Sequence, residues 1–309
     1  MKPNVIFSSS YYKLFGFSFL ILFFELALIR FIPSNVRITA YFINLVLVAA
    51  FLGMGIGMLR VKGERNITQF FPPLLLLLTG ACVYFSNVLV VAPNQGEALY
   101  ALYFDLSPQS REWGMVPVVS VFFTLSTLPF IALGYAMGRE FKNFPPLYAY
   151  AINTAGSLAG LLVFSLLSHF STPPIVWFGI GGLFFLFLAG KQQNLVVSVL
   201  CMGLVFYLVQ SLYKKDHEIW SPYYKINHYE IGDPNKPERT SINVNGSLHQ
   251  YMINFSPSSD SQKSLNDEIK RQYQLPYRFA KSWEDVLILG AGSGNDVNLV
   301  LEQDAINID

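Results

Sequence analysis

The chain has 309 residues, a formal net charge of +1 and only 13% charged residues, and its basic side chains form no long run. A near-neutral chain without a basic patch lacks the electrostatic footprint of a nucleic-acid-binding protein, so we exclude nucleic acid as a partner. The two cysteines, Cys82 and Cys201, lie inside apolar stretches, where cysteine serves as a small hydrophobe, so the sequence contains neither a disulfide framework nor a metal site.

Charge divides the chain into a membrane-like part and a soluble-like part. Residues 1–213 carry 17 charged side chains and residues 214–309 carry 24. A hydrocarbon core of about 30 Å requires roughly 20 apolar residues in a helix, and seven segments of the first part satisfy this length. They run approximately over residues 13–32, 39–59, 71–92, 115–138, 147–169, 173–190 and 193–213. The more polar stretch 93–114 is expected to form an extramembrane loop with some helix.

Glu25 is the one acidic residue deep in a predicted span. Burial of a carboxylate in lipid is costly, so such a residue is a candidate for function. Two interpretations stay open: a structural contact between helices, with Asn44, Asn153 or Arg30 as partner, and the handling of an ion or ligand. Arg30, near the end of the span, can also extend its charge to the membrane surface. The span is too long for the apolar region of a cleaved signal peptide.

Small residues recur at close spacing in two predicted spans. They are Ala151, Ala155 and Ala159 with Gly156 and Gly160 beside them in the fifth span, and Gly53, Gly55 and Gly57 in the second. Such strips let helix backbones approach closely in lipid. Helix packing is the favoured interpretation, and a substrate path lined by these residues is the alternative.

The basic residues of the predicted loops favour a cytoplasmic N-terminus. On the N-terminal side lie Lys2, Lys13, Arg60, Lys62, Arg65, Arg139, Lys142 and Lys191, against Arg30, Arg37, Arg111, Lys214 and Lys215 on the other side. With seven spans, the soluble part would then lie outside the cytoplasm. The sequence predicts a multi-pass protein of the cell (inner) membrane and leaves open the exact span count and the side that the soluble part faces.

The soluble part begins with short alternating runs that predict β-strands. Residues 223–231, 240–244 and 247–255 have this pattern, and Asn245-Gly246 separates the second run from the third. Asn-Gly between alternating runs predicts a hairpin, because a type I′ turn needs positive φ at both central residues. A polar loop at 256–261 and a helix over 265–280, interrupted by Pro276, are expected to follow.

A glycine-rich turn follows an apolar run of strand length at 285–289 and precedes an amphipathic helix. Its glycines are Gly290, Gly292 and Gly294, and position 295 is asparagine. Glycine allows the tight turn and a close approach of the backbone to a ligand. The spacing departs from the G-x-G-x-x-G of dinucleotide sites. It resembles the G-x-G-x-G motif of class I adenosylmethionine-dependent transferases.

Several motifs in order sharpen this resemblance. They are Trp220-Ser-Pro-Tyr-Tyr-Lys-Ile226, Asn245-Gly-Ser-Leu-His-Gln250, Leu275-Pro-Tyr277 and Val286-Leu-Ile-Leu-Gly-Ala-Gly-Ser-Gly-Asn-Asp296. Together they resemble the spermidine synthase family, and most closely its membrane-fused members, in which a multi-span domain precedes an aminopropyltransferase-like domain. Residues 25–30 and 148–160 also resemble that membrane domain.

The resemblance implies a transferase with S-adenosylmethionine or its decarboxylated form as co-substrate. The residues that it implies for donor binding are Gly290, Ala291, Gly292, Ser293, Gly294, Asp296, Tyr224 and Gln250. Tyr224 stands where aminopropyltransferases usually have glutamine, and Ser293 where they have aspartate. Both differences weaken recognition of the decarboxylated donor, so aminopropyl and methyl transfer both stay open. Asp296 has two interpretations, a helix cap and a ligand contact.

The predicted fold is an α-helical multi-span membrane domain (1–213), a β-hairpin subdomain (214–281) and the first β-α unit of a Rossmann-type, methyltransferase-like α/β domain (282–309). A ribose-binding acid is expected near the end of the second strand. Asp309 has the spacing of that acid, but the family resemblance favours a position near the start of the strand, with the acid and the catalytic residues beyond residue 309. The Rossmann-type domain is therefore expected to be incomplete and the chain as given to be inactive. The predicted partners are the lipid bilayer and a small-molecule substrate, with a polyamine as one candidate; self-association stays open. A transporter or a scaffold with a degenerate nucleotide-binding sensor is the alternative to the transferase.

Overall fold

The structure is a computed structural model in which two compact units, Met1–Lys225 and Ile226–Asp309, are described separately. The structure describes residues 9–42, 44–63, 66–86, 88–91, 112–189, 194–213, 217–233, 236–255, 260–280, 282, 284–303 and 305–309. Most of the predicted loop at 93–114 therefore lies outside the described residues, as do residues 256–259 of the predicted polar loop.

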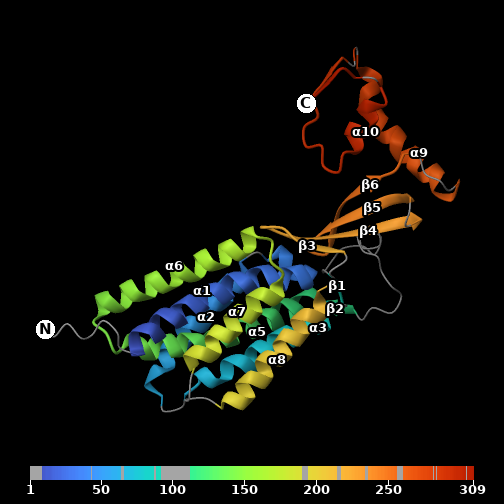
Figure 1. The fold of residues 1–309 in the computed structure, drawn as a ribbon. Coiled ribbons are helices and arrows are strands. Elements are labelled where there is room, and N and C mark those ends of the chain that lie inside the picture. Colours follow the sequence, from blue (N-terminus) through green and yellow to red (C-terminus); the bar gives the residue numbers. More distant parts are fainter. Residues whose placement is uncertain are drawn as a thin grey trace. The chain divides into compact units, whose positions relative to one another are not determined.

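The first unit is a bundle of helices that lie side by side (Figure 1). Its elements are α1 (Ser9–Asn35), η2 (Arg37–Tyr41), α2 (Leu45–Leu59), η3 (Arg60–Lys62), η4 (Thr68–Phe70), α3 (Phe71–Phe85), β1 (Leu89–Val91), β2 (Glu112–Gly114), α5 (Met115–Phe141), α6 (Pro146–His169), α7 (Pro174–Ala189), α8 (Leu195–Leu212) and β3 (Glu218–Trp220). The core is aromatic and aliphatic, and α1 supplies many of its fully buried side chains, including Phe23, Phe24 and Phe31.

Six helical segments of the described chain are long and apolar enough to cross a membrane. They are Ser10–Asn35, Leu45–Lys62, Thr68–Phe85, Met115–Phe141, Pro146–His169 and Leu195–Leu212. The sixth predicted span forms α7, which at 16 residues is shorter than the roughly 20 that a spanning helix requires. The unit is thus compatible with a multi-pass membrane protein, with six candidate spans where the sequence predicted seven.

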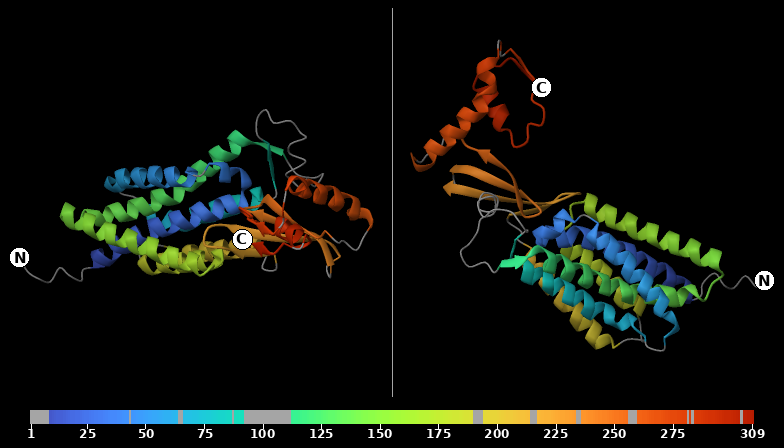
Figure 2. Two further views of the ribbon diagram at one scale, coloured as in Figure 1. Left: turned by 90° about the horizontal axis from the view of Figure 1, so that it is seen from above. Right: turned by 180° about the vertical axis from the view of Figure 1, so that it is seen from behind.

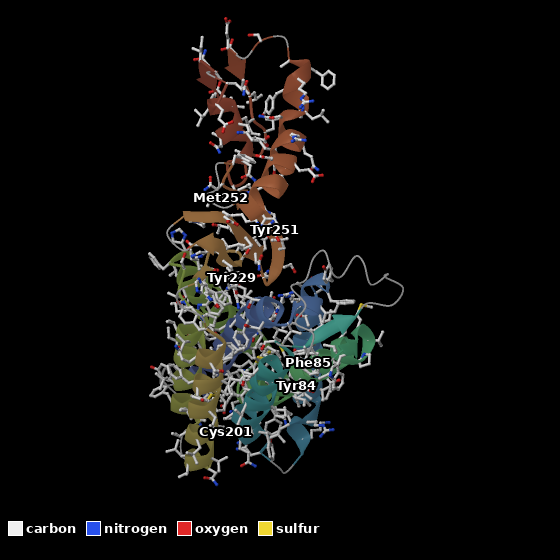
Figure 3. All side chains as sticks on the ribbon, turned by 90° about the vertical axis from the view of Figure 1, so that its right-hand side faces the viewer. Tyr84, Phe85, Cys201, Tyr229, Tyr251 and Met252 are labelled. Atoms are coloured by element: carbon white, nitrogen blue, oxygen red, sulfur yellow. The ribbon has the colours of Figure 1, made fainter. Side chains whose placement is uncertain are left out.

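The third predicted span is longer than the helix that forms there. Helix α3 ends at Phe85, and residues Leu89–Val91 form β1, which pairs in parallel with β2. Two valines follow Leu89, and β-branched residues favour strand over helix. At the end of α3, the Phe85 ring packs against Trp113, with 5.4 Å between ring centroids, and Figure 3 shows Phe85 next to Tyr84.

Glycines determine how closely the helices of the bundle approach. A Cβ atom on Gly156 or Gly160 would lie 2.4 Å from the carbonyl oxygen of Phe15 or Phe19 in α1. A Cβ on Gly53 or on Gly57 would likewise lie 2.3 Å from a carbonyl oxygen of α5. These four glycines confirm the packing interpretation.

Most of the other small residues of the two strips do not share this role. A Cβ atom on Gly55 would meet no heavy atom within 4 Å, and Ala151 and Ala155 are exposed. Of the three alanines, only Ala159 is partly buried against the core, so the packing strip of α6 consists of Gly156, Gly160 and Ala159.

The second unit contains an antiparallel meander of β4 (Lys225–Asp233), β5 (Lys236–Val244) and β6 (Ser247–Ile253), of which β4 starts at the last residue of the first unit. It continues with α9 (Asp260–Gln274), η6 (Pro276–Phe279), β7 (Asp285–Val286), α10 (Asn295–Leu301) and β8 (Asn307–Ile308) (Figure 2). The predicted Asn-Gly hairpin is confirmed: Val244 pairs with Ser247, and φ is 50° at Asn245 and 77° at Gly246. Helix α9 starts earlier than predicted, so that Asp260 belongs to it and not to a loop.

Candidate nucleotide-binding loop

The glycine-rich turn at residues 290–294 connects β7 to α10. All three glycines have positive φ, 75° at Gly290, 57° at Gly292 and 82° at Gly294, a region that L side chains seldom adopt. Strand β7 pairs in parallel with β8, with Asp285 opposite Asn307. Strand, glycine turn, helix and parallel strand thus follow one another, but β7 and β8 have two residues each, and the Rossmann-type domain stays a prediction.

Ser293 and Asn295, the first residue of α10, hold the turn against β6. The Asn295 side chain accepts a hydrogen bond from the backbone N–H of Ile253 (3.0 Å) and donates one to the carbonyl oxygen of Tyr251 (2.7 Å). The hydroxyl of Ser293 donates to the same carbonyl oxygen (3.1 Å). Asn295 is buried, so these bonds are shielded from water and fix the turn on the sheet.

The Gln250 side chain lies against the turn. A Cβ atom on Gly292 would be 2.6 Å from Oε1 of Gln250, whereas a Cβ on Gly290 or Gly294 would meet no heavy atom within 4 Å. Gly290 and Gly292 are exposed. The turn therefore presents open backbone on one part of its surface and a carboxamide beside its middle glycine.

Asp296 does not cap α10. The N-cap position belongs to Gly294, and no side chain makes a cap hydrogen bond there. Asp296 instead accepts a hydrogen bond from the Tyr277 hydroxyl, and burial, together with this carboxylate, raises the pKa of Tyr277. The cap interpretation is wrong because the chain enters the helix one residue before Asn295, through a left-handed glycine.

The predicted donor-binding residues are brought together only in part. Gln250, Gly292 and Ser293 form one cluster at the end of β6, and Asp296 is held by Tyr277. Tyr224 belongs to the first unit, where its side chain is exposed. Sequence reasoning missed Asn295, which it noted only as the position without glycine; a polar residue directly after a glycine turn was the available signal.

Strand β7 is shorter than predicted. It covers Asp285–Val286, and the side chains of Leu287 and Leu289 are 69% and 86% exposed. A parallel sheet is stable when both faces are covered, and β7 and β8 have no further layer over these leucines within the described residues.

In the first unit, Arg30 organises the segment that carries Tyr224. Its guanidinium donates to the Ser168 hydroxyl (2.5 Å) and to the carbonyl oxygen of Ser221 (2.6 Å). It also lies 4.9 Å from the ring centroid of Trp177 and 5.7 Å from that of Trp220. Two aromatic faces and two hydrogen bonds hold one cation where α1 ends.

Further contacts hold the segment 218–225 to α1 and α6. Lys225 forms an ion pair with Glu218 (3.4 Å) and donates to Oδ1 of Asn35 (3.3 Å), and Glu218 also accepts from the indole N–H of Trp220 (2.5 Å). Ser168 donates its hydroxyl to the carbonyl oxygen of Pro222. The turn at 221–224 is thereby fixed on the helices.

Glu25 is buried, and no hydrogen bond or ion pair joins it to another residue in the described part of the chain. The structural pairings expected with Asn44, Asn153 or Arg30 are therefore not formed. Arg30 bonds Ser168 and Ser221 instead.

Comparison with protein-family models, with curated proteins and with solved structures found no match to this chain.

Proposed function

We propose that the chain is an integral-membrane transferase, similar to the membrane-fused spermidine synthase-like proteins, whose second unit binds an adenosylmethionine-type donor at the glycine turn. The observation that carries the proposal is the set of three positive-φ glycines between a strand and a helix, with open space beside Gly290 and Gly294 and the Gln250 side chain beside Gly292. The helical unit would hold this site at a bilayer.

The turn and its neighbours have two kinds of role in the proposal, contact with the donor and positioning of the turn. Backbone N–H groups around Gly290 and Gly292 would contact the polar part of the donor, and the Gln250 carboxamide would supply a donor and an acceptor beside them. Ser293 and Asn295 position the turn through the Tyr251 carbonyl oxygen. Transfer from a sulfonium by in-line attack depends mainly on such positioning.

Titration calorimetry on the full chain with S-adenosylmethionine and with its decarboxylated form tests the proposal. Measurable binding of at least one form is expected, and the preferred form distinguishes methyl from aminopropyl transfer. Absence of heat with both, in a chain that unfolds cooperatively, would overturn the donor assignment.

A glycine pair supplies the matched controls. Gly290→Ala and Gly292→Ala both place a Cβ on a positive-φ backbone, but only the second meets Gln250. We expect Gly292→Val to abolish binding, and Gly292→Ala to bind more weakly than Gly290→Ala. Gln250→Ala in the Gly292→Ala background removes the contact with Oε1 while the strain of a Cβ at positive φ stays. No difference in donor affinity among these variants would show that the donor does not contact the turn.

Glu25 favours one second candidate, a transporter whose second unit senses a ligand. A buried carboxylate without a described partner inside a candidate span is typical of ion and substrate pathways. Substrate flux that depends on Glu25, tested with Glu25→Gln, and that survives loss of donor binding in Gly292→Val would support this candidate over the transferase.

A further inference from the structure

Helix α7 extends along most of α1, although it has only 16 residues. Near the end of α1, the Arg30 guanidinium carbon lies 4.9 Å from the ring centroid of Trp177. Near the start of α1, a Cβ atom on Gly16 would lie 2.5 Å from the Leu188 side chain. The 14 positions from Gly16 to Arg30 correspond to about 21 Å along a helix. Because the early residue of α7 meets the late residue of α1, the two helices are antiparallel.

We call the end of the helical unit at which α1 begins the proximal end, and the end at which α1 ends the distal end. Helix α6 is parallel to α1, because Gly156 packs against Phe15 and Gly160 packs against Phe19. It ends at the distal end, so α7, which follows it, begins there.

Helix α8 is antiparallel to α7. A Cβ atom on Gly182 would lie 3.3 Å from the sulfur of Met202, and one on Gly179 would lie 3.8 Å from the Phe206 ring. The later residue of α7 thus meets the earlier residue of α8. Because α7 begins at the distal end, α8 ends there, and the chain continues from that end into the second unit.

The remaining helices alternate in direction as well. Asn143, two residues after α5, donates a hydrogen bond to the Ser10 hydroxyl at the start of α1 (3.2 Å), so α5 ends at the proximal end. The Phe85 ring at the end of α3 lies 5.6 Å from the Phe122 ring near the start of α5, so α3 ends at the distal end. The glycines of α2 meet residues of α5 in the same order along both helices, so α2 ends at the proximal end.

These directions require α7 to cross the bundle. Helices α6 and α8 are each long and apolar enough to span a membrane, and both end at the distal end. The chain must therefore return to the proximal end between them, and α7 is the one described helix in that stretch. A helix a few residues shorter than usual spans where the bilayer thins locally, at a modest cost in free energy.

Basic residues indicate which end faces the cytoplasm. With this alternation, eight basic residues of the sequence belong to the proximal helix ends and connections, and five belong to the distal ones, Lys214 and Lys215 included. Connections rich in lysine and arginine stay in the cytoplasm. We propose that α7 is a seventh membrane crossing, that the proximal end is cytoplasmic, and that the chain after α8, with the second unit, lies on the other side. No described helix after Leu212 is long and apolar enough to bring it back.

The side of the second unit determines which pool of donor the glycine turn meets. An ionised ligand enters hydrocarbon only at a large cost in free energy, so a donor on one side of a bilayer is separated from the other side. The second unit therefore draws its donor from outside the cytoplasm, and a process that carries the donor across the membrane must supply it. The crossing itself rests on membrane insertion and not on donor binding.

Cysteine labelling of the full chain in spheroplasts, with a membrane-impermeant maleimide, tests the side of four exposed positions. They form two pairs, Asn143→Cys with Asn194→Cys and Phe170→Cys with Ser282→Cys. Within each pair, the first position follows α5 or α6, whose crossing is not in question, and the second follows α7 or α8. The first member of each pair therefore serves as the reference for the second.

Two controls keep the labelling interpretable. The unsubstituted chain is the blank, because Cys82 is buried and Cys201 lies within α8. Cooperative thermal unfolding in detergent verifies that each variant folds. If Ser282→Cys does not, alkaline phosphatase fused after Asp309 reports the same side, because it forms its disulfides and becomes active only outside the cytoplasm.

We expect Phe170→Cys and Ser282→Cys to react in intact spheroplasts, and Asn143→Cys and Asn194→Cys to react only after permeabilisation. In a chain with six crossings, Asn194 and Ser282 would exchange sides while the two reference positions keep theirs, and this result would overturn the crossing by α7. Inverted labelling at all four positions would overturn the assignment of the proximal end to the cytoplasm. No donor is present in the experiment, so failure of the proposed donor binding gives a different result, loss of heat in calorimetry with unchanged labelling.

Discussion

Replacement of Gly57 by alanine should destabilise the helical unit, because α2 and α5 are in backbone contact there. The added Cβ would lie 2.3 Å from the carbonyl oxygen of Ile131 and 2.6 Å from the backbone nitrogen of Tyr135. Neither atom can move without a shift of α5, and the reverse contact is equally close, since a Cβ on Gly134 would lie 2.6 Å from the carbonyl oxygen of Met54.

The magnitude follows from two opposing terms. Overpacking costs typically about 1–3 kcal/mol, and a clash with backbone belongs at the upper end of that range. Alanine regains up to about 1 kcal/mol of helix propensity over glycine. We therefore expect a net loss of about 2 kcal/mol for Gly57→Ala, which lowers the unfolding temperature by roughly 4–8 °C for a unit of this size.

Gly55→Ala is the matched control, two residues away on the same helix. A Cβ on Gly55 would meet no heavy atom within 4 Å, so only the propensity term applies and stability should be unchanged or slightly raised. Thermal unfolding of the two variants in the same detergent, followed by tryptophan fluorescence, makes the comparison. Equal unfolding temperatures for Gly55→Ala and Gly57→Ala would refute the close packing of α2 on α5.

Three further predictions concern polar contacts. Arg30→Lys keeps the charge but loses the two hydrogen bonds to Ser168 and Ser221. It should lower the free energy of unfolding of the first unit by about 2 kcal/mol, measured by chemical denaturation. Stability equal to that of the parent would show that the charge alone suffices. Asn295→Ala removes the partner of the Ile253 N–H and one partner of the Tyr251 carbonyl oxygen, so it should lower the free energy of unfolding of the second unit by about 2 kcal/mol or more. Ser293→Ala removes one hydrogen bond and should lower it by less. The reverse order of the two denaturant midpoints would contradict this. The pKa of Tyr277 is raised in the folded chain, so its contribution to stability is fully present below the ordinary tyrosine pKa of about 10 and is lost as pH rises through the higher folded value. Tyr277→Phe should remove this loss of stability at alkaline pH, which is measured as the free energy of unfolding against pH.

Local signals in the sequence predicted the local features of the fold. The Asn245-Gly246 turn was predictable because its conformation depends on two residues that tolerate positive φ. The glycine turn at 290–294 was predictable for the same reason. The length of the apolar runs located the helices. It could not show that α7 is shorter than a usual span, because its 16 residues are only a few fewer than the roughly 20 that a spanning helix requires.

Contacts between distant segments were not predictable from the sequence. The sequence showed that Glu25 and Arg30 lie in one span, and it left Arg30, Asn44 and Asn153 open as partners of Glu25. In the structure, Arg30 is held by Ser168 and by Trp177 and Trp220, from segments more than a hundred residues away. Such partners depend on how helices pack, and a single sequence contains no periodic signal for them.

The Arg30 contacts relate the two parts that the charge distribution separates. Ser221, Pro222 and Lys225 lie in the part that the charge distribution assigns to the soluble half, yet their side-chain and carbonyl partners include Arg30, Asn35 and Ser168 of the helices. The backbone of Ser221 and Pro222 is thus held by side chains of α1 and α6. Because the turn at 221–224 takes its conformation from these contacts, the exposed Tyr224 ring depends on the helices for its position. The helices α1 and α6 therefore determine the geometry of the turn that carries Tyr224.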